Sequence, residues 1–315
     1  MINRRSFISG IKGTTLSNKE IAFLKKYKPW GIILFARNLK NIQQIKRLTK
    51  QIRNIFKDKK YPIIIDQEGG RVNRLRNFIS LDNLTSKYFG NLFLNNERNF
   101  NLIYKLFIDK TCYLLRNLGI NINTVPVLDL IYKGSSNIIG DRAYSTNPKV
   151  VSIIGDICIK YFKNNSIGTV IKHIPGHGLA KSDSHNFTPI IKKPFSFLIK
   201  NDFKTFQSKD ALFAMTAHVI YQKIDPNNTV THPQKVISII RNQIKFRNIL
   251  ITDDLSMKSL KYSLEENTIR AFNAGCNIAL HCNGNLKEMN VVARNSPKLN
   301  SFIIKKTSEF YKNMS

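Results

Sequence analysis

The stretch that decides the fold runs from Gly168 to Gly178 and reads GTVIKHIPGHG. Its first half is an apolar, β-branched run, which predicts a buried strand. Pro175 and Gly176 then break any helical register, so His173 and His177 cannot form the one-face helical pair of a zinc protease. Polar residues gathered where an apolar strand ends are typical of α/β enzymes, which keep their chemistry there.

The same loop continues to Asp183 and His185, an acid and a histidine separated by one residue. Asp-x-His is a compact way to orient an imidazole and to stabilise its charged form. Alone, this pattern is more often two solvated side chains. With Lys172 and His173 at the end of the same strand, a functional site is the better interpretation.

Short apolar runs of this kind recur along the chain. They cover residues 7–9, 31–35, 62–66, 120–127, 168–172, 212–216, 249–252 and 276–281. Amphipathic, Lys-rich stretches between them, such as 41–56 and 101–118, predict helices, and either Asn38 or Asn41 could cap the first. Strands of this type predict a parallel sheet with both faces buried. We therefore predict an α/β fold, a (β/α)₈ TIM-type barrel, as a single domain over residues 1–315.

A doubly wound parallel sheet is the alternative fold. It is disfavoured because no Gly-rich dinucleotide fingerprint follows any of the predicted strands.

Composition limits the setting and the partners. No apolar run reaches the length of a membrane span, and the N-terminus is too short and polar for a secretory signal. The four cysteines lack metal-ligand or redox spacing, which favours a reducing, cytoplasmic location. The net charge of +30 could serve a polyanion, but the basic residues are spread over nearly every predicted helix, which favours compositional drift. We expect no specific nucleic acid, no membrane, no metal and no cofactor.

Polar residues follow most of the predicted strands, and in a parallel barrel these strand ends share one face. The segment 66–74 reads DQEGGRVNR, and later strand ends carry Asp129, Asp141, Arg142, Thr216, His218, Asp253, Asp254 and His281. Carboxylates bind sugar hydroxyls in pairs, and one can attack an anomeric carbon. The pattern predicts a hydroxyl-rich substrate. Two residues also have a purely structural interpretation: Asp254 as a helix N-cap and Asp129 as a support of the barrel rim.

On these motifs the chain resembles the β-N-acetylglucosaminidases of glycoside hydrolase family 3, and in particular the bacterial single-domain branch of peptidoglycan recycling. The likeness extends from the segment 30–38 to the segment 281–284. It is most specific in the segment 66–72, the loop 172–185 and the segment 253–257.

The resemblance implies roles for individual residues. Asp253 matches the catalytic nucleophile, His185 the general acid/base, and Asp183 the residue that orients and tunes His185. Five further residues match those that hold the terminal N-acetylglucosamine: Asp66, Arg74, Arg142, Lys172 and His173.

The activity implied is that of a retaining exo-β-N-acetylglucosaminidase. It would remove β-1,4-linked N-acetylglucosamine from anhydro-muropeptides through a covalent glycosyl-enzyme, with muropeptides as partners and a monomer as the expected state. Two alternatives stay open. A phosphorylase or transglycosylase could use the same intermediate, and a non-catalytic protein could use the pocket to bind sugar or a polyanion.

Overall fold

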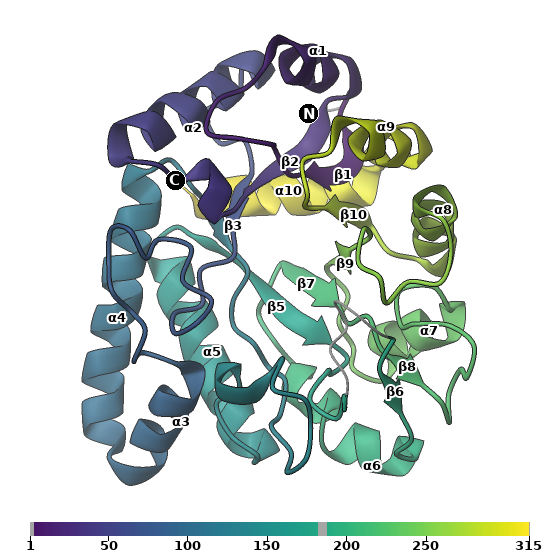
Figure 1. The fold of residues 1–315 in the computed structure, drawn as a ribbon. Coiled ribbons are helices and arrows are strands. Elements are labelled where there is room, and N and C mark those ends of the chain that lie inside the picture. The colour runs from purple at the N-terminus through teal and green to yellow at the C-terminus, as the bar shows by residue number, and fades with distance from the viewer. Residues whose placement is uncertain (1–2, 182–187, 315) are drawn as a thin grey trace.

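Eight parallel strands close into a barrel in this computed structural model, which describes residues 3–181 and 188–314 (Figure 1). Their order around the barrel is their order along the chain, and the last strand pairs with the first. The strands are β1 (Arg5–Ser9), β2 (Pro29–Leu34), β3 (Ile63–Ile65), β4 (Ile122–Asn123), β5 (Gly168–Ile174), β7 (Phe213–Thr216), β9 (Ile249–Asp254) and β10 (Ile278–His281). The predicted (β/α)₈ barrel is confirmed, with each predicted apolar run supplying one strand.

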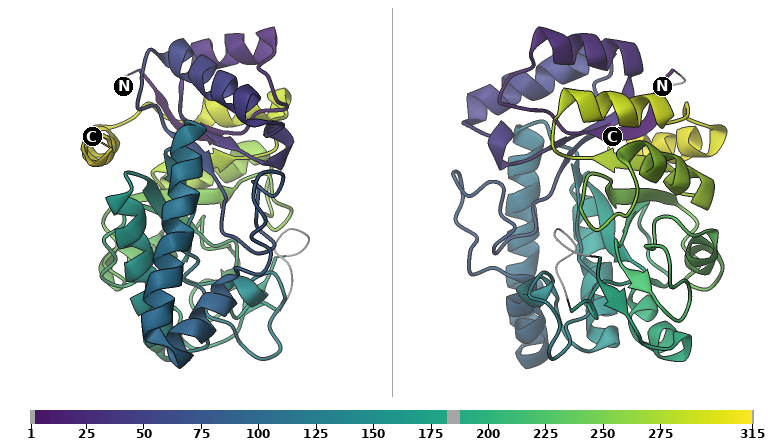
Figure 2. Two further views of the ribbon diagram at one scale, coloured as in Figure 1. Left: turned by 90° about the vertical axis from the view of Figure 1, so that its left-hand side faces the viewer. Right: turned by 45° about the vertical axis from the view of Figure 1, so that its right-hand side comes forward.

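Helices connect the strands and cover the outside of the barrel (Figure 2). They are α1 (Asn18–Tyr27), α2 (Ile42–Phe56), α3 (Ser86–Asn95), α4 (Glu97–Asn117), α5 (Pro148–Asn164), α6 (Phe195–Lys200), α7 (Gln234–Asn242), α8 (Leu264–Ala274), α9 (Leu286–Asn295) and α10 (Ser301–Asn313). Short 3₁₀ turns are η1 (Ala36–Asn38), η2 (Gly140–Arg142) and η3 (Phe203–Phe206), and β6 (Ile190–Ile191) pairs with β8 (Ile220–Tyr221) outside the barrel.

Asn41 is the residue that caps the predicted helix over 41–56. Its side-chain oxygen accepts a hydrogen bond from the amide of Gln44 at 2.9 Å, which satisfies one of the free N–H groups of the first turn of α2. Asn38 is instead buried and donates to the carbonyl oxygens of Ile11 and Gly13, so it ties the β2 loop to the β1 loop.

Strand β4 is much shorter than the predicted run over 120–127. Pro126 has no N–H to give to a ladder. Asn121 and Asn123 use their side chains instead: their Oδ1 atoms accept from the amides of Ile63 and Gln67 at 2.8 and 2.9 Å. Side-chain amides thus extend the short backbone pairing of β3 with β4 at both of its ends and hold the segment that follows β3.

The barrel interior and the helix layer form two separate apolar cores. The interior core joins strand side chains to Ile303 and Phe310 of α10, which lies across the amino ends of the strands. Trp30 of β2 is fully buried, and its indole N–H donates to Thr307 Oγ1 of α10 at 2.9 Å. This helix therefore closes the amino-terminal end of the barrel and leaves the carboxyl ends of the strands for a site.

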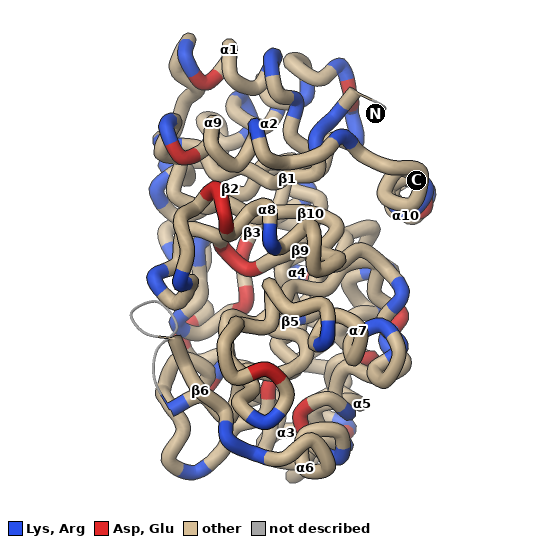
Figure 3. The backbone as a smooth tube through the Cα atoms, turned by 90° about the vertical axis from the view of Figure 1, so that its right-hand side faces the viewer, with Lys and Arg blue, Asp and Glu red and all other residues tan. Residues whose placement is uncertain are grey.

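The positive charge is spread over the molecule. On the face drawn in Figure 3, Lys and Arg occur from α1 to α6 and do not gather over one element. Within the part of the chain that the structure describes, no helix combines the length and the apolar character that crossing a membrane requires.

Candidate active site

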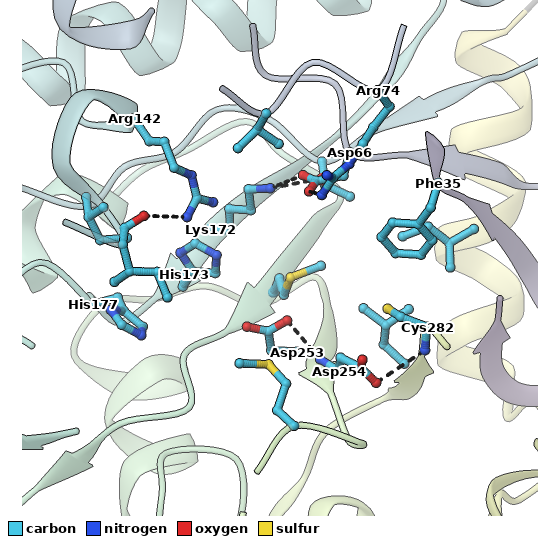
Figure 4. A pocket seen from close by; sticks show the side chains of 18 residues that line it. Phe35, Asp66, Arg74, Arg142, Lys172, His173, His177, Asp253, Asp254 and Cys282 are labelled. Atoms are coloured by element: carbon cyan, nitrogen blue, oxygen red, sulfur yellow. Dashed lines mark hydrogen bonds and ion pairs between the residues drawn. The ribbon is translucent and has the colours of Figure 1, made fainter. Parts of the chain in front are cut away.

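A cavity of about 220 Å³ lies at the carboxyl ends of the barrel strands (Figure 4). Ile33, Met215 and Leu280 belong both to its lining and to the interior core, so the core closes its inner end. The charged and polar lining consists of Asp66, Arg74, Thr124, Arg142, Lys172, His173, His177, Asp253 and Asp254. A ligand therefore enters and leaves on the side of the loops.

Asp66 lies directly after β3 and is the centre of one polar cluster. Its Oδ1 accepts from Lys172 Nζ of β5 and from Thr124 Oγ1 at 2.7 Å, and its Oδ2 accepts from Arg74 Nη2, also at 2.7 Å. Burial alone would raise the pKa of Asp66, but Lys172, Arg74 and Arg142 outweigh burial and hold this pKa well below its ordinary value. Asp66 is therefore an ionised hydrogen-bond acceptor at neutral pH.

Glu68 brings Arg142 to the cavity. The guanidinium of Arg142 donates two hydrogen bonds to the Glu68 carboxylate, each at 2.8 Å, and Lys172 Nζ lies 2.6 Å from Glu68 Oε1. Burial opposes the charge on Glu68, yet Arg142 and Lys172 keep the pKa of Glu68 below its ordinary value. Glu68 was not among the predicted binding residues, although it lies in the same 66–74 segment.

Asp129 does more than support the barrel rim. It is buried, its Oδ2 lies 2.7 Å from His173 Nδ1, and its Oδ1 accepts from the amide of His177 at 2.6 Å. Burial opposes its ionisation, but His173 and these hydrogen bonds keep the pKa of Asp129 below its ordinary value. Asp129 thus fixes the ring of His173 and the turn that follows it, a long-range role with no local signal in the sequence.

Asp253 and Asp254 end β9, and both line the cavity. Asp253 Oδ1 accepts from the amide of Asp254 at 2.8 Å, whereas Asp254 Oδ1 accepts from the amides of Ser256 and Cys282 at 3.1 and 3.2 Å. The interpretation of Asp254 as a helix N-cap is wrong, because the next helix, α8, is capped by Ser263. Asp254 holds the loop after β9 against the end of β10.

Among the described residues, no basic side chain is bound to the carboxylate of Asp253, whereas the carboxylate of Asp66 is paired with Lys172 and Arg74. Asp254 also lacks a basic partner, but both of its carboxylate oxygens accept from the hydroxyl of Ser256. Burial would raise its pKa, but the imidazoles of His218 and His173, the amide of Asp254 and Lys172 together hold the pKa below its ordinary value. Asp253 is therefore ionised and available to a ligand, as a nucleophile must be.

The structure brings six of the predicted site residues together around this one cavity: Asp66, Arg74, Arg142, Lys172, His173 and Asp253. The other two, Asp183 and His185, lie outside the described residues. Over the ranges 3–181 and 188–314, no three His, Cys, Asp or Glu side chains are grouped so that they could hold a metal ion.

A buried acid, Asp202, packs against the loop that follows β5. Asp202 is 2% exposed and accepts from the hydroxyl of Tyr132 at 2.8 Å. It packs against Gly176, where an added Cβ would come within 2.8 Å of the Asp202 Cβ. Burial raises the pKa of Asp202 to about 7, although the hydrogen bond from Tyr132 acts in the opposite direction.

We expect Asp202→Asn to flatten the pH dependence of stability between about pH 4 and pH 7. In that range the folded protein keeps the Asp202 proton and the unfolded chain releases it, so the free energy of unfolding falls as pH rises. The slope from this group is at most about 1.4 kcal/mol per pH unit. Urea unfolding at pH 5, 6, 7 and 8 measures the slope for both proteins. Asp210→Asn is the control, because the side chain of Asp210 is 84% exposed. Equal slopes in all three proteins would contradict this expectation.

Comparison with known protein families gives one match that covers most of the chain. Residues 8–304 match the model of the glycosyl hydrolase family 3 N-terminal domain. Among curated proteins, the chain is 34% identical over 284 residues to a β-hexosaminidase of Actinobacillus pleuropneumoniae serotype 5b, with 87% of this chain and 79% of that protein aligned. A β-hexosaminidase of Nitrosomonas eutropha is 33% identical over 282 residues, with the same coverage.

Solved structures give the same picture for the fold. NagZ from Neisseria gonorrhoeae superimposes with a TM-score of 0.84 at 26% sequence identity, over 98% of this chain and 90% of that chain. A family 3 β-N-acetylglucosaminidase from Paenibacillus sp. str. FPU-7 superimposes with a TM-score of 0.85 at 24% identity, over 98% of this chain and 60% of that chain.

Proposed function

Because this chain belongs to glycosyl hydrolase family 3, we propose that it is a retaining exo-β-N-acetylglucosaminidase acting on peptidoglycan fragments. Its substrate is β-1,4-linked N-acetylglucosamine at the non-reducing end of an anhydro-muropeptide. The chain is a family 3 β-hexosaminidase, as its relatives indicate. The retaining mechanism, the exo cleavage and the peptidoglycan substrate are the parts that we propose.

One observation carries the proposal: the Asp253 carboxylate faces a cavity with a closed inner end and a charged cage for hydroxyl groups. The ion pairs of Asp66 and Glu68 with Lys172, Arg74 and Arg142 fix the donors and acceptors of this cage before any ligand arrives. Such preorganisation favours a neutral, hydroxyl-rich ligand. A cavity of about 220 Å³ with a closed floor suits one terminal sugar ring and therefore exo cleavage.

The proposed mechanism has two displacements. Asp253 attacks the anomeric carbon while His185, as imidazolium, gives a proton to the leaving oxygen, and a covalent glycosyl-enzyme forms. Neutral His185 then takes a proton from water, whose oxygen displaces Asp253 and releases the sugar with its β configuration. Asp183 orients and tunes His185. A histidine suits this double role because its reference pKa of about 6.5 lies close to operating pH.

In this proposal, Asp66, Arg74, Arg142, Lys172 and His173 hold the sugar, and residues 1–315 act as one catalytic domain. The proposal of a single domain is supported by the closed barrel, because every described residue of the site lies on it or on its loops. A cytoplasmic location, a monomeric state and the absence of nucleic-acid and membrane partners stay predictions from the sequence.

The experiment is a comparison of matched substrates. We expect hydrolysis of 4-nitrophenyl N-acetyl-β-glucosaminide, and at least about 10²-fold slower hydrolysis of the β-glucoside, because a site built around the acetamido group loses those contacts. The α-linked N-acetylglucosaminide should not be cleaved. NMR of the first product formed should show the β anomer. Equal rates on the glucoside, or an α product, would overturn the proposal.

The natural substrate and the acceptor are tested separately. An N-acetylglucosaminyl-β-1,4-anhydromuramoyl peptide should be cleaved faster than chitobiose if peptidoglycan fragments are the substrate. Adding inorganic phosphate should not change the rate or give a sugar 1-phosphate. A sugar 1-phosphate would favour the phosphorylase alternative, and no turnover of any substrate would favour the binding-protein alternative.

A further inference from the structure

A buried chain of hydrogen bonds connects the two ends of the Asp253–Asp254 segment. The amide of Asp253 lies 3.4 Å from Thr216 Oγ1, and Thr216 Oγ1 lies 2.9 Å from Thr231 Oγ1. Thr231 Oγ1 lies 2.9 Å from His218 Nδ1, and His218 Nε2 lies 3.1 Å from the carbonyl oxygen of Asp254. Thr216 ends β7, His218 lies between β7 and β8, and Thr231 lies between β8 and α7. All three side chains are 0% exposed.

The positions of the hydrogens along this series of hydrogen bonds follow from the groups at its two ends. The carbonyl of Asp254 can only accept, so His218 Nε2 carries a hydrogen and donates. Burial lowers the pKa of His218 and favours its neutral form, in which Nδ1 accepts from Thr231. Thr231 then accepts from Thr216, which accepts from the amide of Asp253. Every hydrogen in the chain has an acceptor only when His218 is the neutral Nε2–H tautomer.

The strand ladder does not hold this segment on its own. Ile251 is paired with Ile278 but Asp254 with Leu280, so β9 has one residue more than β10 over this interval. Such a bulge re-aims a side chain and interrupts the regular ladder hydrogen bonds. On the other side, the pairing of β9 with β7 ends at Ile251 and Met215. Asp253 thus lies where both ladders fail, and the hydroxyl of Thr216 replaces the missing ladder acceptor.

We propose that His218, Thr231 and Thr216 are positioning residues for Asp253, and that they hold its bulged backbone so that the carboxylate points at the anomeric carbon. This inference rests on the proposed role of Asp253 as the nucleophile. None of the three side chains is in the cavity lining, so they act through Asp253 rather than on the sugar. They should therefore affect the attack on the anomeric carbon and leave sugar binding nearly unchanged.

The test measures covalent labelling separately from binding. A 5-fluoro N-acetylglucosaminyl fluoride reports the rate of attack, with the label mapped by mass spectrometry, and calorimetry with free N-acetylglucosamine reports binding. We expect Thr231→Val to slow labelling about 10- to 100-fold, the effect of a small misplacement of a reacting group. The dissociation constant for N-acetylglucosamine should stay within about twofold, since binding does not need the attack. Thr231→Ser, which keeps the hydroxyl, should restore labelling.

Thr229→Val is the matched control. Thr229 is 4% exposed, and its hydroxyl has no hydrogen-bond partner among the described residues, so its loss should leave labelling and binding unchanged. Labelling of Thr231→Val at the rate of Thr229→Val would overturn the proposal. An equal loss of labelling and of sugar affinity in Thr231→Val would also overturn it, because the whole pocket would then have changed.

Two variants of His218 test the hydrogen bond from His218 Nε2 to the Asp254 carbonyl. A Gln side chain can place its amide N–H where His218 Nε2–H lies, whereas Asn is too short to reach the Asp254 carbonyl. We expect His218→Gln to be labelled at least about fivefold faster than His218→Asn. A fivefold ratio of rates corresponds to about 1 kcal/mol, which is what one hydrogen bond usually contributes. Equal rates would contradict a role for this bond. If the wild-type protein carries no label on Asp253, the proposed function itself fails, and this is visible before any variant is compared.

Discussion

Asp253→Ala should give a protein that binds N-acetylglucosamine but forms no covalent glycosyl adduct. The carboxylate is ionised, lines the cavity and has no basic partner bound to it among the described residues, so its loss removes the attacking group without leaving an unpaired charge behind. We expect turnover to fall by roughly 10⁴- to 10⁶-fold, as when other hydrolases lose a covalent nucleophile. The dissociation constant for the sugar should change much less, because the cage around Asp66 and Glu68 stays intact.

Chemical rescue gives the sharper measurement. The space left by the carboxylate can admit azide, which attacks the same face of the sugar and expels the nitrophenolate. The product should be the α-glycosyl azide, with inverted configuration, whereas the wild-type protein gives β-N-acetylglucosamine. In the wild-type protein, the 5-fluoro sugar should label Asp253 alone. A label on Asp66 or Asp254, or a β-glycosyl azide from the variant, would show that another residue is the nucleophile.

His185→Ala should lose about 10²- to 10⁴-fold in activity on a natural sugar leaving group, the usual worth of a positioned proton transfer. The first step should be affected far less with nitrophenyl substrates, since nitrophenolate leaves without a proton. The second step still lacks its base, so the glycosyl-enzyme should accumulate and appear as a burst of nitrophenolate in stopped-flow measurements.

A variant of the neighbouring acid serves as the graded comparison. Asp183→Asn should act in the same direction as His185→Ala but more weakly, because the imidazole remains and only its orientation and basicity change. Equal losses on sugar and nitrophenyl substrates, with no burst, would show that His185 is not the proton donor. His173 and Glu68 would then be the next residues to change.

The fold could be predicted because its signal is local. Each barrel strand is a short β-branched run, and such runs are recognised without knowing their neighbours. The helix predicted over 41–56 matches α2, and that over 101–118 matches most of α4. Strand β4 could not be delimited, because it depends on how the side chains of Asn121 and Asn123 bind the neighbouring strand.

The site was predictable only in part. The residues around the cavity follow strand ends, and closure of a parallel barrel places all strand ends on one face. Which residue pairs with which is a long-range property: Glu68 with Arg142 joins the loops after β3 and β4, and Asp129 with His173 joins the loop after β4 to strand β5. The bulge that displaces Asp253 and Asp254 depends on β10, so Asp254 was given a local role that the structure contradicts.

Barrel closure has a consequence for protein synthesis on the ribosome. Strand β1 pairs with β2, which is made soon afterwards, but its other edge pairs with β10, near the opposite end of the chain. Helix α10, whose Thr307 and Phe310 close the amino-terminal end of the barrel, is made after β10. While the ribosome is still adding residues, the nascent chain must keep an open edge on β1 and an uncovered apolar interior. Exposed edges and apolar surface are what chaperones recognise and what drives aggregation. The edge of β1 and the barrel interior are therefore covered only after β10 and α10 have been made.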